Sequence, residues 1–433
     1  MKKALLLIVP LLLALAACAP KPVTDEQGRR EIVLATVFFD SYLEKQVMTF
    51  NESNPDYYIR VDDYYEAITP GVYYEYEAYL EGLRRLDAAI AKGAWNSKAP
   101  DIFIIRSDSY HKYAQKDLFA DLTGMFAEDV EAAAVYEKVL NTLRVEGKLY
   151  GVAPFFTIFV MCRDEMMADQ DMAMAAMAAL QREADYSIMG GGAPTVIFDQ
   201  WLRMYMNNFI DWTSYSCDFD HPDFIAILEM MKDAPPHWEE VTIFEPISEG
   251  QPLILTTAIS NAFSYQIFHD LFAGRMVVSG YPGQEAVFEV SMDAIVSIAK
   301  KSPYKEAAWS FLRGIISDEN QAKIRGGGFI PSIPISRSAV RAEMSQLMSP
   351  APGHGTTVRF GDGVEVSVDH VTAEAMEGYA LLLEGDMVLR VFDNTPRFIV
   401  AEEAAAYFEG DIPLEAVIEN INNRVRLYLN ETK

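Results

Sequence analysis

The stretch EIVLATVFFDSYLEKQVMTFNESNPDYYIRV, residues 31–61, places a strand, a helix and a second strand in succession. Its first nine residues are almost continuously apolar, which is typical of a strand buried on both faces of a parallel sheet. Apolar residues then recur at helical spacing, and Asn54-Pro55 is expected to end that helix. Residues 57–61 read as the next strand. Strand, helix and strand within about 30 residues form a βαβ unit.

The same alternation continues along the chain on both sides of its middle. Helical spacing at 81–91 is followed by a short buried strand, and another strand is expected at 292–298. Ser302-Pro303 has the composition of an N-cap followed by proline at the first helical position. Residues 414–429 place their apolar side chains on one helix face. Repeated strand–helix alternation predicts an α/β fold.

The N-terminus has the pattern of a secretory signal. Lys2 and Lys3 form a positive region, and residues 4–14 form an apolar region that is too short for a membrane-spanning helix. The sequence LAAC at 15–18 resembles the lipobox of bacterial lipoproteins. In that family a diacylglycerol is attached to the cysteine sulfur, and the chain is cut just before the cysteine.

This resemblance implies that residues 1–17 are a signal peptide and that Cys18 becomes the lipidated N-terminus. Residues 18–30 then form a flexible tether between the lipid and the folded protein. The chain would be held at the extracytoplasmic face of the cell membrane by this anchor alone. The alternative is an ordinary signal peptide cut nearby, with an incidental cysteine.

Composition excludes several classes of partner. The chain has 433 residues and a formal net charge of −27, which argues against binding nucleic acid and against lying flat on anionic lipid. Its length implies two or more domains. Beyond the signal, no apolar stretch reaches the ~18 residues of a membrane span. Cys162 and Cys217 do not make a disulfide framework, and the sequence leaves open whether they pair.

Signatures of catalysis and metal binding are also missing. The 6 histidines are scattered, without an HExxH motif or paired cysteine ligands, so no metal site is expected. The GGG runs at 190–192 and 326–328 lack the G-K-[ST] of a phosphate loop, and no G-x-S-x-G is present. Carboxylate pairs are certain to occur among 63 acidic residues, but no spacing singles one out. We therefore expect a non-enzyme that needs no cofactor.

Several stretches, spread over most of the chain, resemble the extracellular solute-binding proteins of ABC importers, the family that includes sugar-binding lipoproteins. They are MTFNESNPDYYIRV (48–61), APDIFIIRSDSYHKYAQKDLFADLT (99–123), EGKLYGVAPFFT (146–157), KEAAWSFLRGIISDENQ (305–321) and EEAAAYFEGDIPLEAVIENINNRVRLYLNE (402–431). Each match alone is loose, but they occur in the order that the family has.

The resemblance implies a two-lobed α/β fold like that of periplasmic binding proteins. Each lobe would be a sheet flanked by helices, and a hinge would join the lobes around the ligand. Lobe one would comprise 31–150 and 290–340, and lobe two 151–289 and 341–433. The chain would thus leave lobe one near Gly151.

The same architecture implies where the ligand lies. Ligands of such sheets sit beyond the carboxyl ends of strands, and a sugar needs flat aromatic walls and directed polar groups. Loops turned toward the cleft carry both kinds of side chain. The candidates are Phe39, Asp40, Ser107, Asp108, Phe155, Phe156, Trp212, Tyr281 and Gln284. The alternative for each is ordinary packing or loop solvation, or, for an aspartate, capping of a helix.

The expected function is capture of a small solute, with a carbohydrate favoured, and its delivery to the transmembrane permease subunits of an ABC importer. We expect a monomer that works by hinge closure, because ligand contacts from both lobes stabilise the closed state. A peptide or polyol is the alternative solute. A lipid-anchored extracellular hydrolase and a sensor subunit that presents its ligand to a receptor are the alternative functions.

Overall fold

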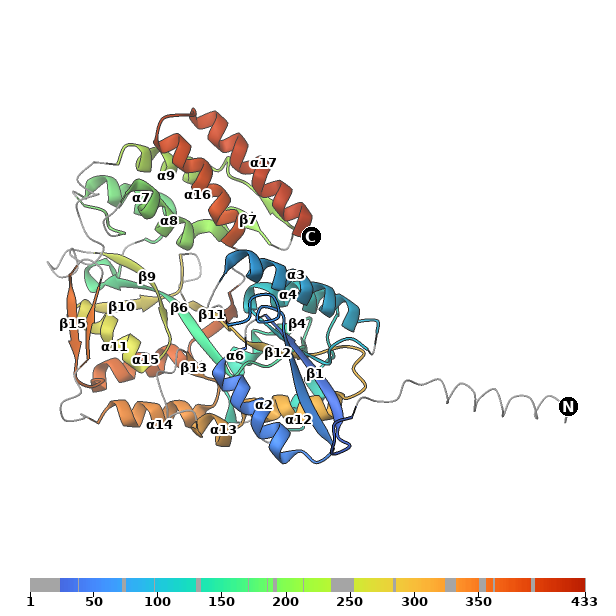
Figure 1. The fold of residues 1–433 in the computed structure, drawn as a ribbon. Coiled ribbons are helices and arrows are strands. Elements are labelled where there is room, and N and C mark those ends of the chain that lie inside the picture. The colour runs from blue at the N-terminus through green and yellow to red at the C-terminus, as the bar shows by residue number, and fades with distance from the viewer. Residues whose placement is uncertain are drawn as a thin grey trace, which may run out of the picture.

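The computed structural model in Figure 1 contains two β-sheets flanked by helices and a separate helical body. The structure describes residues 24–432 except 38, 72–74, 97, 130–133, 170, 185, 190–192, 213, 235–252, 283–285, 324–331, 350–355, 361–362 and 391–393. In this described part, no helix is long and apolar enough to cross a membrane.

The first sheet has the strand order β12-β3-β1-β2. Its strands are β1 (Arg30–Thr36), β2 (Tyr57–Asp63), β3 (Ile102–Ile105) and β12 (Ile295–Ile298). The accompanying helices are α2 (Ser41–Ser53), α3 (Tyr76–Gly93), α4 (Ser107–Gln115) and α12 (Lys305–Ile316). Strand β1 pairs in parallel with both β2 and β3, which confirms the βαβ unit predicted for residues 31–61. Strand β12 joins antiparallel to β3, so a distant segment completes lobe one.

The second sheet is built around β6 (Phe155–Asp164), the longest of its strands. The others are β9 (Ile254–Ile259), β10 (Met276–Ser279), β11 (Val287–Ser291), β13 (Ile333–Pro334) and β16 (Asp386–Leu389). Strands β9, β10 and β11 run antiparallel to β6, and β16 runs parallel to β11. The carboxyl ends of these four strands therefore point toward the end of the sheet where β6 begins.

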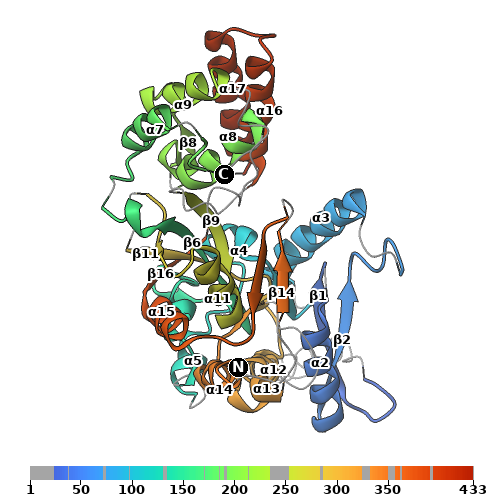
Figure 2. The same cartoon turned by 90° about the vertical axis from the view of Figure 1, so that its left-hand side faces the viewer.

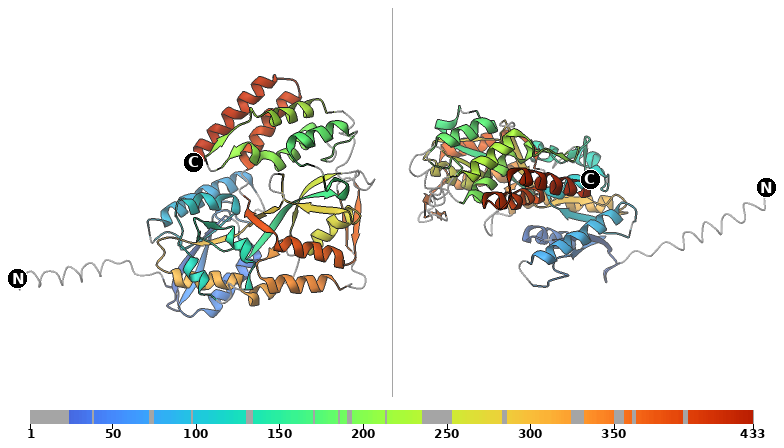
Figure 3. Two further views of the ribbon diagram at one scale, coloured as in Figure 1. Left: turned by 180° about the vertical axis from the view of Figure 1, so that it is seen from behind. Right: turned by 90° about the horizontal axis from the view of Figure 1, so that it is seen from above.

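Helices lie on both sides of this second sheet. On one side α11 (Ala262–Leu271) packs against α15 (Ala373–Glu384) and α14 (Arg337–Leu347). On the opposite side lies the helical body, as Figures 1, 2 and 3 show. Its helices are α7 (Met174–Glu183), α8 (Pro194–Tyr205), α9 (Pro222–Lys232), α16 (Asn394–Phe408) and α17 (Leu414–Thr432). The helix predicted for 414–429 lies within α17.

Short elements complete the described chain. They are α5 (Thr123–Ala127), α6 (Glu137–Asn141), α13 (Asp318–Ala322), two 3-10 turns (Glu165–Met167 and Met206–Asn208), and the hairpins β4 (Arg144–Val145) with β5 (Lys148–Leu149), β7 (Ile210–Asp211) with β8 (Ser216–Cys217), and β14 (Thr356–Arg359) with β15 (Glu365–Val368).

Two hydrophobic cores hold these layers together. One runs without a break through both sheets, and the other fills the helical body around the buried Trp201. Both cysteines among the described residues are free thiols, Cys162 in the sheet core and Cys217 at the edge of the helical body. Burial raises the pKa of the Cys162 thiol to about 12, so this thiol stays protonated.

Two boundaries differ from the sequence-based expectations. The strand over Val290 is β11 and belongs to the second sheet, and the chain re-enters lobe one a few residues later with β12. Helix α12 begins at Lys305 rather than after Ser302, because the Ser302 hydroxyl donates to the Asp101 carboxylate at 2.7 Å. Ser302 therefore ties the first sheet to the segment before α12 and caps no helix.

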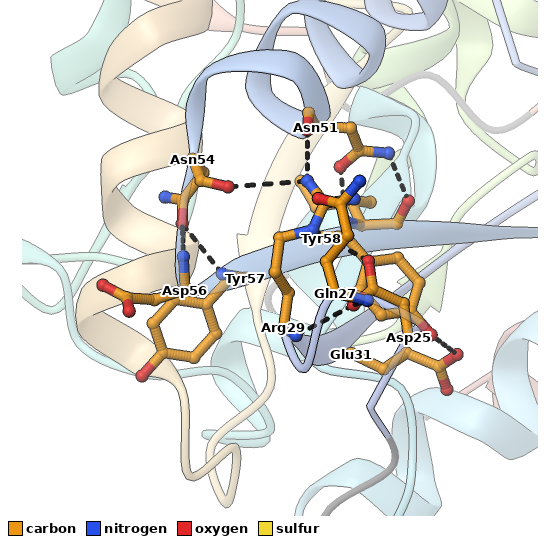
Figure 4. Close-up of polar contacts among 10 residues, drawn as sticks. Asp25, Gln27, Arg29, Glu31, Asn51, Asn54, Asp56, Tyr57 and Tyr58 are labelled. Atoms are coloured by element: carbon orange, nitrogen blue, oxygen red, sulfur yellow. Dashed lines mark hydrogen bonds and ion pairs between the residues drawn. The ribbon is translucent and has the colours of Figure 1, made fainter.

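The folded part of the chain begins before β1. Figure 4 shows the Asp25 carboxylate accepting from Arg29 Nε at 2.8 Å, while the Arg29 guanidinium also donates to the carbonyl of Asn51 at the end of α2. Asn51 in turn bonds both backbone groups of Ile59 in β2. Residues 24–29, expected as part of a flexible tether, are thus fixed to lobe one.

Candidate functional site

A cavity of about 300 Å³ lies between the second sheet and helix α8. This volume falls within the range of small-molecule pockets. Its walls come from two strands, one helix and the segments after two further strands. The lining residues are Phe159, Gln200, Arg203, Thr256, Thr257, Ala258, Tyr281 and Arg390.

Strand register explains which side chains face this cavity. Phe159 in β6 is paired with Ala258 of β9 on one side and with Glu289 of β11 on the other. Paired residues share a face of a sheet, so these three point the same way. Helix α8 covers that face, and the Thr256 hydroxyl lies 3.2 Å from the Gln200 carboxamide oxygen.

Two of the lining residues follow the carboxyl ends of parallel strands. Tyr281 comes after β10, and Arg390 comes directly after β16. Both strands run toward the end of the sheet where β6 begins, although β10 ends opposite Met161 and β16 ends level with Ile158. Strand β6 itself starts just after Val152, which is bridged to Val296 of the first sheet. Tyr281 and Arg390 thus reach the cavity from beyond the carboxyl ends of two strands, a common position for ligand contacts in α/β sheets.

Arg390 is held tightly within the wall. Its guanidinium carbon lies 3.7 Å from the centroid of the Phe159 ring, and its Nε lies 3.5 Å from a Glu289 carboxylate oxygen. Burial raises the pKa of Glu289, and the neighbouring arginine opposes that rise. Burial also raises the pKa of Tyr281 to about 12, so its hydroxyl keeps its proton at neutral pH and is available as a donor.

On the helix side, Arg203 is oriented by Asp199 one turn earlier. Their side chains form an ion pair at 3.0 Å, and Asp199 also accepts from Arg397 of α16. The cavity thus combines aromatic surface with hydroxyl, carboxamide and guanidinium groups. This combination of flat walls and directed polar groups suits a carbohydrate-sized solute.

Of the residues predicted from sequence, Tyr281 lines this cavity. In lobe one, Asp40 is exposed and caps α2, where it accepts from the backbone N–H groups of Tyr42 and Leu43 at 2.8 and 2.9 Å. Desolvation raises the pKa of Asp40, those backbone bonds lower it, and Asp293 raises it further. Its neighbour Phe39 is partly buried against the core.

Ser107 and Phe156 are buried in structural roles. Ser107 Oγ lies 3.1 Å from Ser291 Oγ, and its backbone N–H donates to the Met292 carbonyl at 3.0 Å, which ties α4 to the passage between the lobes. The Phe156 ring is 1% exposed and packs edge-on against Tyr136, so it belongs to the core and not to a cleft wall.

The remaining candidates are spread over both lobes. Phe155, the first residue of β6, is partly exposed and meets the Tyr42 ring edge-on with centroids 4.9 Å apart. Trp212 lies in the β7–β8 hairpin of the helical body, where its indole N–H donates to Asn207 at 3.0 Å. Asp108 lies in α4, and nothing is described of its side chain. Gln284 and Cys18 lie outside the described residues.

Sequence reasoning missed most of this cavity. Arg390 and Arg203 carry no local motif, and Phe159 sits inside an apolar run that resembles any buried strand. One signal was available for Arg390, since an arginine directly after DMVL at 386–389 follows a short strand. That strand was not predicted, because four residues give too little periodicity to recognise.

The comparisons with known proteins agree with this architecture. The chain belongs to the bacterial extracellular solute-binding protein family, whose sequence profile matches residues 50–347. The family is one of binding proteins with an extracytoplasmic location. No curated protein sequence matches the chain.

Solved structures share the fold at low sequence identity. The sugar-binding protein MalE of Xanthomonas citri is 15% identical with a TM-score of 0.53, over 93% of this chain and 98% of that one. An ABC substrate-binding protein of Listeria monocytogenes in complex with cycloalternan is 17% identical with a TM-score of 0.51, over 92% and 99%. The predicted two-lobed α/β fold is confirmed.

Proposed function

We propose that the chain is the carbohydrate-binding subunit of an ABC importer. The observation that carries this proposal is the cavity beside β6, where the rings of Phe159 and Tyr281 stand next to hydroxyl, carboxamide and guanidinium groups. Sugars present apolar C–H faces and hydroxyl edges, and this wall offers a partner for each. The names of structural neighbours, which include a sugar-binding protein and a complex with cycloalternan, support the same class of solute.

The mechanism is closure of the two lobes around the solute. Lobe two supplies the cavity, and lobe one supplies the segment after β1, with Phe39 and Asp40, and the first turn of α4, with Asp108. A sugar that contacts both lobes binds the closed state more tightly than the open state, and this difference in affinity shifts the protein toward closure. The closed complex is then presented to the permease subunits as a monomer, and the bound sugar is released without covalent change.

The test is a thermal-shift screen of the mature protein against neutral and acidic mono- and oligosaccharides, with peptides and polyols in the same panel. A ligand that binds only the folded state raises Tm. At a ligand concentration of a hundred times Kd, it adds about 2.7 kcal/mol to the free energy of unfolding. We expect at least one carbohydrate to raise Tm and to give a saturable titration by calorimetry. A panel in which peptides or polyols raise Tm and no carbohydrate does would overturn the proposal.

We propose further that Cys18 carries a lipid. The described part begins at Thr24, and the five residues between it and Cys18 can span at most about 20 Å, which would hold lobe one close to the membrane. Wild-type protein is expected to enter the detergent phase on partitioning, and Cys18→Ala is expected to stay in the aqueous phase. Mass spectrometry that finds no lipid on the wild-type N-terminus would contradict this proposal.

A further inference from the structure

Two arginines from different elements reach the same cavity. Arg203 comes from α8 with 39% of its side chain exposed, and Arg390 follows β16 with 8% exposed. A guanidinium group has donors and no acceptor, so both residues call for an acceptor-rich ligand. Carboxylates are matched well by such groups, because two parallel N–H bonds reach both oxygens of the carboxylate at once.

The charge around the cavity has the opposite sign to that of the whole protein. Asp199 contacts both Arg203 and Arg397, and Glu289 contacts Arg390. Of the described residues that line the cavity, two are arginines and none is acidic. The complete chain has a formal net charge of −27. Because the rest of the protein is strongly acidic, an anionic ligand is attracted to this positively charged cavity more than to other parts of the surface.

Arg390 is also fixed in position before any ligand arrives. Its guanidinium stacks over Phe159 at 3.7 Å, Glu289 holds its Nε, and its backbone N–H donates to the Val290 carbonyl at 2.8 Å. An arginine stacked on an aromatic ring loses little further freedom on binding. The Thr256 hydroxyl, which donates to the Gln200 carboxamide oxygen, lies in the same wall and suits the neutral groups of a sugar.

We propose that this cavity recognises a carboxylate of the solute, so that the protein binds an acidic carbohydrate that contains a uronic acid. The inference rests on the proposed function, since it names the class of sugar taken up at that site. The uronate carboxylate lies between Arg203 and Arg390, and the ring of the same sugar packs against Tyr281 and Phe159.

The test compares acids with their own neutral esters. Trimers of galacturonate, glucuronate and mannuronate, and the methyl ester of each, are titrated into the wild-type protein by calorimetry at low salt. We expect at least one acid to bind about 10- to 100-fold more tightly than its ester, since charge-assisted hydrogen bonds are lost in the ester. Added salt should reduce the difference in affinity between the acid and its ester, because salt screens the charge–charge attraction.

The outcomes separate the two proposals. If neutral sugars bind and no uronate binds more tightly than its ester, the carboxylate inference is wrong and the proposed function stands. If no sugar of either kind binds, the proposed function fails and the inference fails with it. A sugar sulfate, such as glucose 6-sulfate, that binds more tightly than every uronate would overturn the assignment to a carboxylate.

Substitution of Arg203 localises the effect. Its side chain is partly exposed, so Arg203→Gln is expected to fold normally, with an unchanged circular dichroism spectrum. Affinity for the acid should fall about 10- to 100-fold while affinity for the ester changes little. Arg84→Gln removes an equal charge from the exposed face of α3 and should leave both affinities unchanged. Equal losses for acid and ester in Arg203→Gln would overturn the inference.

Discussion

Tyr281 contributes both an aromatic ring and a hydroxyl to the cavity wall. The side chain is 8% exposed, and burial keeps its pKa near 12, so the hydroxyl is a neutral donor and acceptor at physiological pH. The ring lies 6.0 Å from the Arg390 guanidinium carbon, which places aromatic surface and positive charge side by side. Tyr281 therefore offers a sugar both a stacking surface and a hydrogen bond.

Removal of that hydroxyl should weaken sugar binding without harming the fold. Tyr281→Phe keeps the ring and leaves one sugar hydroxyl without its partner, which costs about 1–3 kcal/mol, or about 5- to 150-fold in affinity. Calorimetry with the best sugar from the panel measures the loss. Tyr57→Phe, in lobe one and away from the cavity, is the matched control and should bind as wild type does. Unchanged affinity in Tyr281→Phe would place the sugar elsewhere.

His111 makes stability depend on pH. Burial lowers the pKa of this α4 side chain, and its Nδ1 has no hydrogen-bond partner among the described residues. In the unfolded chain His111 takes up a proton near pH 6.5, whereas in the folded chain it takes up a proton only at lower pH. The unfolded state then binds more protons, so the stability that is present above about pH 6.5 is lost as the pH falls toward the lower folded pKa.

We expect the stability of His111→Gln to depend less on pH below about pH 6.5 than the stability of the wild type does. Denaturant midpoints at about pH 7.5 and about pH 5.5 should differ less in the variant than in wild type. His370→Gln, which removes an exposed histidine after β15, should keep the wild-type difference. A His111→Gln profile identical to wild type would show that another group causes the loss at acid pH.

At the scale of elements, α2 depends on a residue that was also a candidate for the site. Asp40 accepts from two backbone N–H groups at the start of that helix, so Asp40→Ala should cost about 0.5–2 kcal/mol of stability. Asp40→Asn keeps a capping oxygen and should stay within a few tenths of a kcal/mol of wild type. Thermal or denaturant unfolding of the three proteins measures this.

The same pair of variants separates capping from ligand contact. If the carboxylate binds sugar hydroxyls, Asp40→Asn should lose affinity despite its normal stability. If Asp40 only caps α2, Asp40→Asn should bind as tightly as wild type. Similar stability in Asp40→Ala and wild type would contradict the capping role.

Elements whose pattern is local could be predicted from the sequence. Strand β1, helix α2 and the last helix α17 follow from hydrophobic spacing that one short window contains. Strands β10 and β16 have four residues each, too few to show a period, and they join the second sheet through pairing with distant segments. The cavity was missed for the same reason, because its wall exists only once β6, β9 and α8 are assembled.

The candidates that could be predicted were those that follow strands of visible pattern. Asp40 does follow β1 and Tyr281 does line a cavity, but Phe156 alternates into the core one residue after the partly exposed Phe155. Adjacent residues of a strand place their side chains on opposite faces of the sheet. The sequence alone does not show which of two adjacent phenylalanines faces inward.

At the scale of the molecule, the path of the chain between lobes permits closure. It leaves lobe one after Val152, returns between β11 and β12, and leaves again before β13. Hydrogen bonds between Ser107 and residues 291–292 fix one of these passages to α4. Rotation of the lobes is therefore expected to bend the backbone in these few connections, while each sheet moves as a rigid unit.

Closure should be visible as a smaller radius of gyration in solution. Small-angle scattering of wild-type protein at saturating concentration of the best sugar should give a lower radius than the free protein, because the sugar draws lobe one toward the cavity of lobe two. Arg203→Gln at the same sugar concentration should stay closer to the free radius, since its cavity is less occupied, and a higher concentration should restore the contraction. A sugar that saturates the protein by calorimetry and leaves the radius unchanged would contradict hinge closure, and the cavity would then be a site within lobe two alone.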